Sequence, residues 1–394
     1  MPNKFAKDSL IRFNAGFFSA RVGEWIYTVA LNWIVLTETQ SPWLLAVINA
    51  CRLAPSLVLS WPAGVWADRH DPRRLSLVNN LLNALVMIGV GLALHSGLSI
   101  SWVCGLVLVQ AVLTAVEGPF RNTYMNGLFE GQRLKAAVAH NASLMNAGRI
   151  VGPVVAGLLL TRLGGFASFA VAALCTALFS AVISTLSGGD EVAVRKVRGA
   201  SRFSLWATLR DNREIRDIML LAVPMMFFGF PYTAMLSVLT DTLLHMGAEE
   251  LGALTAISAA GALAASSTLG LKPELANWKQ TMRFALLFAM SLCLLAGAQG
   301  FKSAAVALFL VGYLGQAYRS CSRMHLHEVL PREGAGQILG LSLMDRGMIP
   351  LGGLMLGGIT EVAGARASYA LMGLGCLLAA LYFFYQTRRH PHES

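Results

Sequence analysis

Charged side chains are scarce in this sequence. Only 13% of its 394 residues are Asp, Glu, Lys or Arg, whereas 55% are hydrophobic. Soluble domains usually carry about 25% charged residues. A chain with so few polar residues does not cover its own surface in water. This scarcity excludes a soluble enzyme, a disordered scaffold and a fibrous repeat, and it indicates a polytopic membrane protein.

Several chemical signatures are missing as well. The six cysteines form no C-x-x-C pair, no G-x-x-x-x-G-K-[ST] loop or H-E-x-x-H is present, and no filter-like repeat suggests a channel. His325-x-His327 and His390-x-His392 lack helical zinc spacing, so we expect these histidines to be solvated at or beyond helix ends. We therefore expect no cofactor, no metal site and no enzymatic activity.

Long apolar segments fill most of the chain. The first carries Arg21 and Glu24 and is too long and too charged for a cleavable signal peptide. At helical rise, roughly twelve segments are long enough to span a bilayer. They are residues 10–38, 43–66, 75–96, 102–127, 135–162, 166–187, 215–244, 249–270, 280–299, 303–325, 336–361 and 367–387.

The basic residues indicate the orientation in the membrane. Of the basic residues outside the apolar segments, most lie in alternate connectors and at both ends of the chain, whereas the opposite connectors hold only Arg162, Lys302 and Arg366. Because Lys and Arg accumulate on the cytoplasmic side, both termini and the polar stretch 187–217 are predicted to be cytoplasmic. The net charge of +10 is thereby explained without nucleic acid as a partner.

The two halves of the chain echo each other. Arg149-Ile-Val-Gly-Pro153 has a counterpart in Arg346-Gly-Met-Ile-Pro350, close to half the chain length away. Such a spacing is typical of a parallel repeat about an axis along the membrane normal, although short strings also recur by chance. We predict an all-α fold of two six-helix bundles with pseudo-two-fold symmetry, at residues 1–187 and 215–394, joined by a cytoplasmic linker at 188–214.

The most specific motif follows the second apolar segment, in Gly64-Val-Trp-Ala-Asp-Arg-His-Asp-Pro-Arg-Arg74. It resembles the loop signature of the major facilitator superfamily, Gly-x-x-x-Asp-Arg-x-x-x-Arg-Arg. The superfamily usually has Gly where this chain has Asp71, and this variant is similar to the macrolide-efflux and enterobactin-export branch. The alternative is a basic loop that only sets topology. The predicted gating residues here are Gly64, Asp68, Arg69, Arg73 and Arg74.

These residue types suit a gate. Gly64 allows helices to approach closely, and Asp68 has the chemistry to accept hydrogen bonds from an Arg or a helix N-terminus and so hold one conformation. A second motif, Gly148-Arg-Ile-Val-Gly-Pro153, partly resembles the superfamily's antiporter motif, with Ala156 replacing one glycine. We assign Gly148, Gly152 and Pro153 to gating, the alternative being ordinary helix packing.

The resemblance covers nearly the whole first half, including the strings around Glu24-Trp25 and Glu117-Gly-Pro119, and is thinner in the second half. It implies a secondary active transporter in a bacterial inner membrane that works by alternating access. The motifs favour export of an amphipathic molecule such as a siderophore or macrolide, driven by inward proton flow. Its partners would be this small molecule, protons and the lipid bilayer, and nothing in the sequence demands an oligomer.

Ionisable residues at membrane depth are costly and often functional. Arg21 and Glu24 are spaced i,i+3, and Glu117 and Arg121 are spaced i,i+4, so each pair is expected to share a helix face. One interpretation is that the pairs only neutralise each other. In the other, a carboxylate exchanges protons during transport, with Glu24 as first choice and Glu117 as second.

Arginines outnumber acids in these segments. Arg52, Arg149 and Arg346 lack an acid at i±4, although Asp345 adjoins Arg346. Arg recognises carboxylate or phosphate in a bidentate manner. This favours an anionic or zwitterionic substrate, unless an acid on another helix pairs with them. The predicted substrate-binding residues are Arg21, Trp25, Arg52, Asn146, Arg149, Tyr232, Tyr313 and Arg346. Proton-coupled uptake of a metal chelate or metabolite, and a sensor that binds ligand without flux, are the alternatives.

Overall fold

The computed structural model describes residues 2–67, 69–186, 212–275, 277–330 and 344–389, with residues 338 and 342. In these ranges the regular elements are all helices, so the all-α prediction is confirmed. Two compact units divide the chain. The first comprises Met1–Gln40, Cys51–Val197 and Gly247–Ala256, and the second comprises Ser41–Ala50, Arg198–Met246 and Ile257–Ser394. Asp68 and most of the predicted linker, residues 188–211, lie outside the described residues, and the predicted bundle boundaries stay a prediction.

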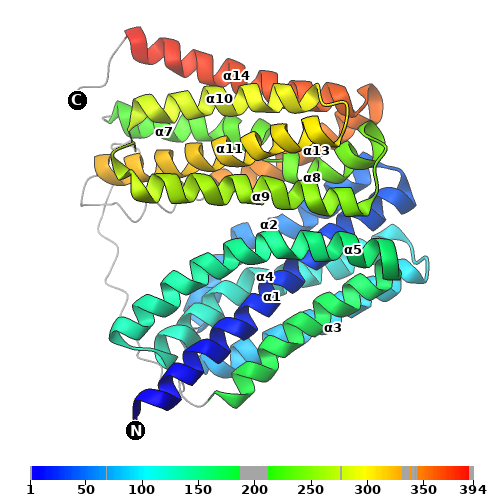
Figure 1. Ribbon diagram of the computed structural model, residues 1–394, viewed down its shortest axis with the longest axis vertical. Helices are drawn as coiled ribbons and strands as arrows, with labels where there is room; N and C mark the ends of the chain where they lie inside the picture. Colours follow the sequence, from blue (N-terminus) through cyan, green and yellow to red (C-terminus); the bar gives the residue numbers. More distant parts are fainter. Residues whose placement is uncertain are drawn as a thin grey trace. The chain divides into compact units, whose positions relative to one another are not determined.

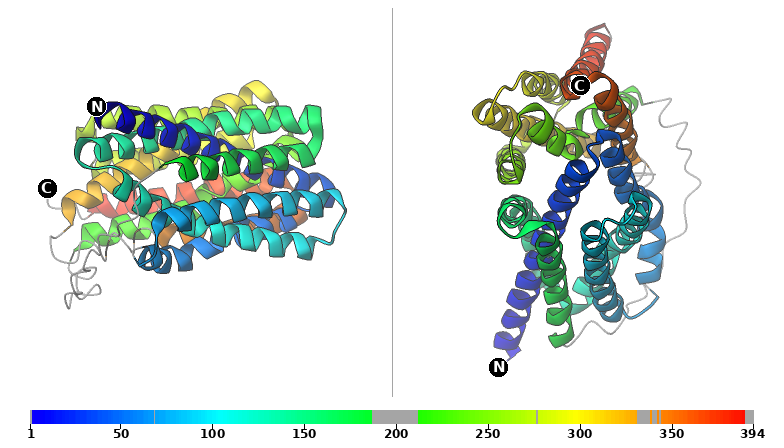
Figure 2. Two further views of the ribbon diagram at one scale, coloured as in Figure 1. Left: turned by 90° about the horizontal axis from the view of Figure 1, so that it is seen from below. Right: turned by 90° about the vertical axis from the view of Figure 1, so that its right-hand side faces the viewer.

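Long helices build the first unit. α1 packs along α5, α3 packs along both α5 and α4, and these neighbours lie side by side in the views of Figures 1 and 2. The helices are α1 (Pro2–Thr39), α2 (Pro42–Ala67), which belongs to this unit from Cys51, α3 (Pro72–His95), α4 (Ile100–Leu128) and α5 (Gly131–Thr185).

α5 covers most of two predicted segments, 135–162 and 166–187, as two helices joined at a kink. Its 55 residues would extend about 80 Å if straight, more than twice the thickness of a ~30 Å hydrocarbon core. Gly164 interrupts it with φ of 83°, a left-handed conformation that glycine adopts without steric cost. The single kink therefore allows two crossings of a bilayer.

An aromatic cluster closes one end of this unit. The Phe13 ring meets Phe129 edge-on at 5.7 Å between centroids and Phe179 at 5.6 Å, and Tyr124 lies 6.3 Å away. All four side chains are at most 3% exposed. Edge-to-face pairs of this kind add to the energy of area burial. These contacts hold α1 against α4 and α5 and fix the register of α1. Several side chains of the site described below belong to α1.

Shorter and more irregular helices build the second unit. α10 packs against α11 and α14, and α13 packs against α14 (Figure 1). The predicted segment 215–244 is broken by π-helical turns around Pro231. In order the elements are α7 (Arg213–Pro224), η1 (Met225–Gly229), α8 (Tyr232–Val238), η2 (Leu239–Leu243), α9 (Ala248–Leu271), which belongs here from Ile257, η3 (Pro273–Leu275), α10 (Trp278–Ala296), α11 (Phe301–Val329), η4 (Met344–Gly347), α13 (Met348–Ala363) and α14 (Ala365–Arg389).

Length and composition alone identify helices fit to cross a membrane. Seven helical stretches of the described residues meet this condition, and α5 is long enough for two crossings. α13 is apolar but shorter. The seven are Pro72–His95, Ile100–Leu128, Gly131–Thr185, Arg213–Leu243, Ala248–Leu271, Trp278–Ala296 and Ala365–Gln386.

Candidate functional site

Three helices of the first unit turn polar faces toward one another. On each helix these residues recur at three- or four-residue intervals, which places them on one side. α1 and α4 supply charges, whereas α3 supplies carboxamides. The faces are Phe17, Arg21, Glu24 and Thr28 of α1, Gln110, Thr114, Glu117 and Arg121 of α4, and Ser76, Asn80, Asn83 and Met87 of α3.

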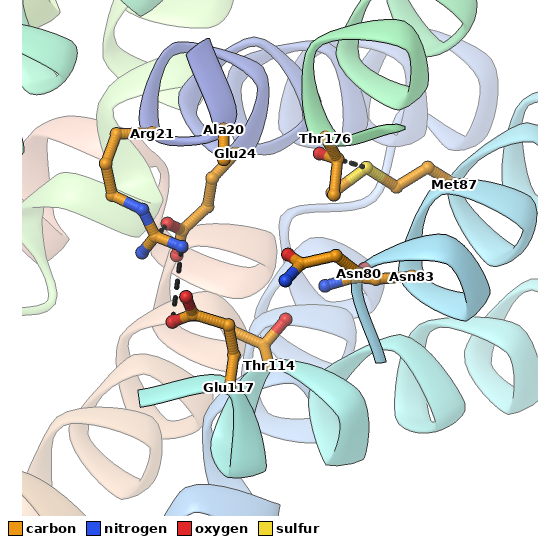
Figure 3. Close-up of a pocket in the computed structure, with 9 residues that line it drawn as sticks. All are labelled: Ala20, Arg21, Glu24, Asn80, Asn83, Met87, Thr114, Glu117 and Thr176. Carbon is orange, nitrogen blue, oxygen red and sulfur yellow. Dashed lines mark hydrogen bonds and ion pairs between the residues drawn. The ribbon is translucent and has the colours of Figure 1, made fainter. Parts of the chain in front are cut away.

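The two predicted charge pairs form one network. The Arg21 Nη1 atom lies 2.5 Å from Glu24 Oε2, and its Nη2 atom lies 3.4 Å from Glu117 Oε2 (Figure 3). Arg121 Nε donates to the other Glu117 oxygen at 2.9 Å. Each Glu and each Arg carries one formal charge, so the four groups balance. Glu117 is 6% exposed and Glu24 32%, which makes Glu117 the interior member.

Phe17 lies against both arginines of the network. Its ring centroid is 5.2 Å from the guanidinium carbon of Arg21 and 4.5 Å from that of Arg121. This cation–π contact supplements the ion pairs around the buried Glu117 and Arg121. Arg21 Nε and Arg121 Nη1 are buried without a hydrogen-bond partner among the described residues. The network therefore holds spare donors next to its carboxylates.

A small pocket with both polar and apolar lining adjoins the ion pairs. Figure 3 shows the amides of Asn80 and Asn83 directed toward the same space as Glu117. The free space corresponds to about one water molecule, too little for a drug-sized ligand. The lining residues are Ala20, Arg21, Glu24, Asn80, Asn83, Met87, Thr114, Glu117 and Thr176.

The glycines of the second motif place α5 directly on α1 beside this network. A Cβ atom on Gly148 would lie 2.8 Å from Arg21 Cβ. One on Gly152 would overlap Trp25 Cβ and lie 2.9 Å from the Val22 carbonyl oxygen. Only glycine fits at this spacing, as expected for a small-xxx-small face. Pro153 follows within the same helix. The gating role predicted for these residues stays a prediction.

The loop after α2 has a clear local structure. Asp71 caps the N-terminus of α3, where its Oδ1 atom accepts from the backbone N–H groups of Arg73 at 2.9 Å and Arg74 at 3.1 Å. The Arg73 guanidinium donates to Ser184 O at 2.8 Å and to Ile183 O at 3.4 Å, at the C-terminus of α5. A cation there satisfies free carbonyls and complements the helix dipole. Arg73 thus fastens α3 to α5.

The other members of the loop motif differ in their surroundings. Arg74 is 88% exposed, 4.0 Å from Asp71, and Arg69 is exposed too. Gly64 lies in the last turns of α2, and Asp68 falls outside the described residues. The charge latch predicted for Asp68 is therefore untested.

Four predicted substrate-binding residues of the first unit lie outside the pocket. Arg149 stacks over the Trp25 ring, 5.6 Å from its centroid. Arg52 donates from Nη1 to the Thr28 hydroxyl at 2.5 Å. Neither arginine forms an ion pair within the described part of the chain. Asn146 donates to a carbonyl of its own helix, Ala142 O. Of the predicted binding residues whose side chains the structure describes, Arg21 alone joins the network.

The remaining predicted binding residues belong to the second unit. Tyr232 is 3% exposed, and its hydroxyl lies 2.9 Å from Ser258 Oγ. Tyr313 donates from its hydroxyl to Thr268 Oγ1 at 3.4 Å. Arg346 falls in η4, but its side chain is outside the described set. All three assignments stay predictions.

One histidine prediction is wrong. His327 is exposed as expected, but His325 is 7% exposed, with its Nε2 atom 2.8 Å from Glu214 Oε1 of α7. Its Nδ1 atom lies 3.8 Å from Glu328. The expectation failed because the His325 side of α11 faces α7, which the sequence alone does not reveal. His390 and His392 lie outside the described residues.

Sequence reasoning missed the polar face of α3. Asn79 donates to Leu113 O, Asn80 to Ser76 O, and Gln110 Nε2 to Thr114 Oγ1 at 2.9 Å, all in buried positions. The signal was present, because Asn79, Asn80 and Asn83 are spaced on one helical face of an otherwise apolar segment. Arg121 was recognised only as a partner of Glu117.

Comparison with known proteins identifies the family of this chain. Residues 13–394 match the family model described as "Transmembrane secretion effector". The chain belongs to the transmembrane secretion effector family, within the major facilitator superfamily. The staphyloferrin A transporter of Staphylococcus aureus is 28% identical, over 96% of each chain. The multidrug efflux pump Tap of Mycolicibacterium fortuitum is 25% identical, over 94% of this chain and 93% of its own. Macrolide efflux protein A of Streptococcus pyogenes is 23% identical, over 88% of each.

Solved structures confirm the major facilitator fold for this family member. The nucleoside transporter NupG superimposes with a TM-score of 0.76, at 12% identity, over 96% of this chain and 99% of its own. A bacterial homologue of the lysosomal transporter Spinster gives 0.75, at 13% identity, over 98% and 97%. The twelve predicted segments are consistent with this fold. The protein is a multi-pass membrane transporter of small molecules, not an enzyme.

Proposed function

We propose that this transporter is a proton-coupled exporter of an amphipathic small molecule, a siderophore or a macrolide-like drug. In this proposal it works by alternating access in a bacterial inner membrane, with both termini in the cytoplasm. The main support is the buried network in which Arg21 bridges Glu24 and Glu117. The names of the relatives, a siderophore transporter and two efflux proteins, support the substrate class.

The arrangement of the network supports proton coupling. Glu117 is buried and held by two arginines, so its protonation leaves Arg121 without its anion. Glu24 is partly exposed and shares Arg21 with Glu117, which gives the cluster contact with water. A change of charge at one carboxylate therefore alters the pairing of all four groups. In this proposal, a proton on one carboxylate shifts the four groups from the present pairing to a second one.

The arginines outside the network support a substrate with an anionic group. Arg149 rests on the Trp25 ring, and Arg52 donates to the Thr28 hydroxyl with Glu24 near enough to interact electrostatically. Both cations thus have capacity for a bidentate acceptor. In this proposal Arg149 and Trp25 form an aromatic and cationic surface for the substrate, and Arg52 contributes a second contact. Gly148 and Gly152 keep α5 against α1 while the helices move.

A reconstituted flux assay tests this proposal. Purified protein in liposomes with an internal pH-sensitive dye is given staphyloferrin A, erythromycin or ethidium as probes, and radiolabelled probe flux is followed in both directions. We expect one probe class to exchange for protons. Glu117→Gln should reduce proton-coupled flux at least tenfold, and Glu24→Gln should reduce it several-fold. Glu130→Gln, at an exposed carboxylate, is the control and should match the wild type.

Three outcomes would contradict parts of this function. Probe movement together with protons into the compartment that stands for the cytoplasm would favour the uptake alternative. Tight probe binding without flux would favour a sensor. Full proton exchange in Glu117→Gln and Glu24→Gln would remove both carboxylates from the coupling step.

A further inference from the structure

Protonation of Glu117 creates a hydrogen-bonding demand that its present partners do not meet. The carboxylate accepts from Arg121 on one oxygen and pairs with Arg21 on the other. Once protonated, the group carries an O–H that needs an acceptor. A guanidinium has five donors and no acceptor. A buried donor left without a partner is costly, so a stable protonated state requires a further acceptor.

The lining of the pocket supplies such acceptors, Asn80 from α3 and Thr114 from α4 itself. Asn80 is 1% exposed, and its Nδ2 atom donates to Ser76 O at 2.8 Å. This bond sets the amide orientation and leaves Oδ1 to accept. Thr114 Oγ1 accepts one hydrogen bond from Gln110 and retains a second lone pair and its own hydrogen. Both side chains line the pocket together with Glu117, as Figure 3 shows.

The size of the pocket decides how the groups communicate. Within the described residues, Glu117 has no direct hydrogen bond to Asn80 or Thr114, yet all three line a space of about one water molecule. A site of that size with several polar partners suits one bridging water. Resting on the proposed function, we propose that this pocket is a water-binding site which, with Asn80 and Thr114, accepts the hydrogen of protonated Glu117.

The chemistry of the step is a simple proton addition. One O–H bond forms at Glu117, its charge falls from minus one to zero, and no oxidant or reductant takes part. The charged groups that face it are Arg21 and Glu24 of α1 and Arg121 of α4. α3 and α5 contribute uncharged lining residues, Asn80 and Asn83 from the former and Thr176 from the latter. Asn80 and Thr114 are thus positioning residues that set the pH at which Glu117 accepts its proton.

Infrared titration of the purified protein in lipid tests this role with the proton as the probe. The carbonyl band of a protonated carboxyl is assigned to Glu117 by its loss in Glu117→Gln. In Asn80→Leu and Thr114→Val the midpoint pH of this band should fall by about half to one unit, because one hydrogen bond to the protonated form is lost. The bridging water should appear as an O–H band shifted by H₂¹⁸O and weakened in the same variants.

Matched controls separate this role from general damage. Asn79→Leu removes a neighbouring buried carboxamide of α3 that bonds Leu113 O and does not line the pocket. Thr114→Ser keeps the hydroxyl. Both should keep the wild-type midpoint. If Asn80→Leu does not fold, the pair Thr114→Val and Thr114→Ser decides the question alone.

The negative outcomes are distinguishable. A Glu117 band that titrates normally in Asn80→Leu and Thr114→Val would overturn the inference and leave proton coupling standing. An equal shift in Asn79→Leu would show a merely structural effect and would overturn it too. The absence of any titrating Glu117 band in the wild type would overturn the inference together with Glu117 as a coupling residue.

Discussion

Arg21 of α1 and Glu117 of α4 meet across two helices, with Arg21 Nη2 3.4 Å from Glu117 Oε2. This contact turns two local charge pairs into one four-membered network, since Arg21 also holds Glu24 and Glu117 also holds Arg121. Removal of one member therefore leaves a buried charge that the others do not fully compensate. The following predictions use this network and the helix contacts around it.

The first prediction concerns the stability of the network. Glu117→Leu should lower the free energy of unfolding by roughly 3–5 kcal/mol, because it leaves Arg121 buried and unpaired. Glu117→Leu combined with Arg121→Leu should recover part of that loss, since Arg21 keeps Glu24. Unfolding in mixed micelles measures both. If the double variant loses as much stability as Glu117→Leu and Arg121→Leu lose together when measured singly, this coupling is contradicted.

The second prediction concerns the contact between α5 and α1. Gly152→Ala should destabilise the protein by roughly 1–3 kcal/mol, because the new methyl group overlaps Trp25 Cβ and approaches Val22 O. Gly118→Ala in α4 is the matched control, as no atom lies within 4 Å of the added Cβ. It should be neutral or stabilising by up to about 1 kcal/mol. Thermal unfolding of both variants checks the difference, and equal midpoints would refute it.

The third prediction concerns Asp71, where the superfamily pattern usually has glycine. Asp71→Ala should cost about 1 kcal/mol, because the α3 cap from Arg73 N–H and Arg74 N–H to its carboxylate is lost. Asp71→Gly should cost only a few tenths of a kcal/mol, since glycine is tolerated at an N-cap. Hydrogen exchange of the first turn of α3 reports the cap directly. Identical exchange rates in Asp71→Ala and the wild type would exclude a capping role.

The fourth prediction concerns the charge of the substrate. With Glu117 ionised the four-group network is neutral, and one added proton makes it positive. An anionic ligand at Arg21 or Arg121 should then bind more tightly as pH falls, whereas a cationic ligand should compete with the proton. Equilibrium binding of staphyloferrin A and ethidium, followed from neutral pH down to the acid limit of the protein's stability, measures both slopes. If the affinities of the two ligands depend on pH in the same way, or if the dependence persists in Glu117→Gln, the charge of this network does not govern ligand binding.

Local patterns in the sequence were sufficient for most of the fold. Apolar segments of bilayer length predict each helix because a backbone in lipid satisfies its own hydrogen bonds only as a helix or a closed barrel. The break in α7–α8 was not visible as a gap in hydropathy, because Pro231 interrupts hydrogen bonding without lowering apolarity. The two predicted segments in α5 meet at Gly164, whose positive φ forms the kink between them.

The candidate site was only half visible. Spacing along one helix gave the pairs Arg21–Glu24 and Glu117–Arg121, because i,i+3 and i,i+4 contacts are local. The burial of His325 against Glu214 was missed, since α7 and α11 are more than a hundred residues apart. Asn80 was missed for a related reason. Its place in the pocket depends on which residues of other helices lie opposite it, and the sequence of α3 does not show this.

The sequence by itself determined the membrane environment, the helices, the superfamily signature and the two local charge pairs, because each depends on composition or on residues within one or two helical turns. Tertiary structure alone decided that Arg21 reaches Glu117, that Gly152 seats α5 on Trp25, and that α3 lines the pocket with carboxamides. These features depend on helix register and rotation, which are set when distant segments pack and which no local pattern encodes.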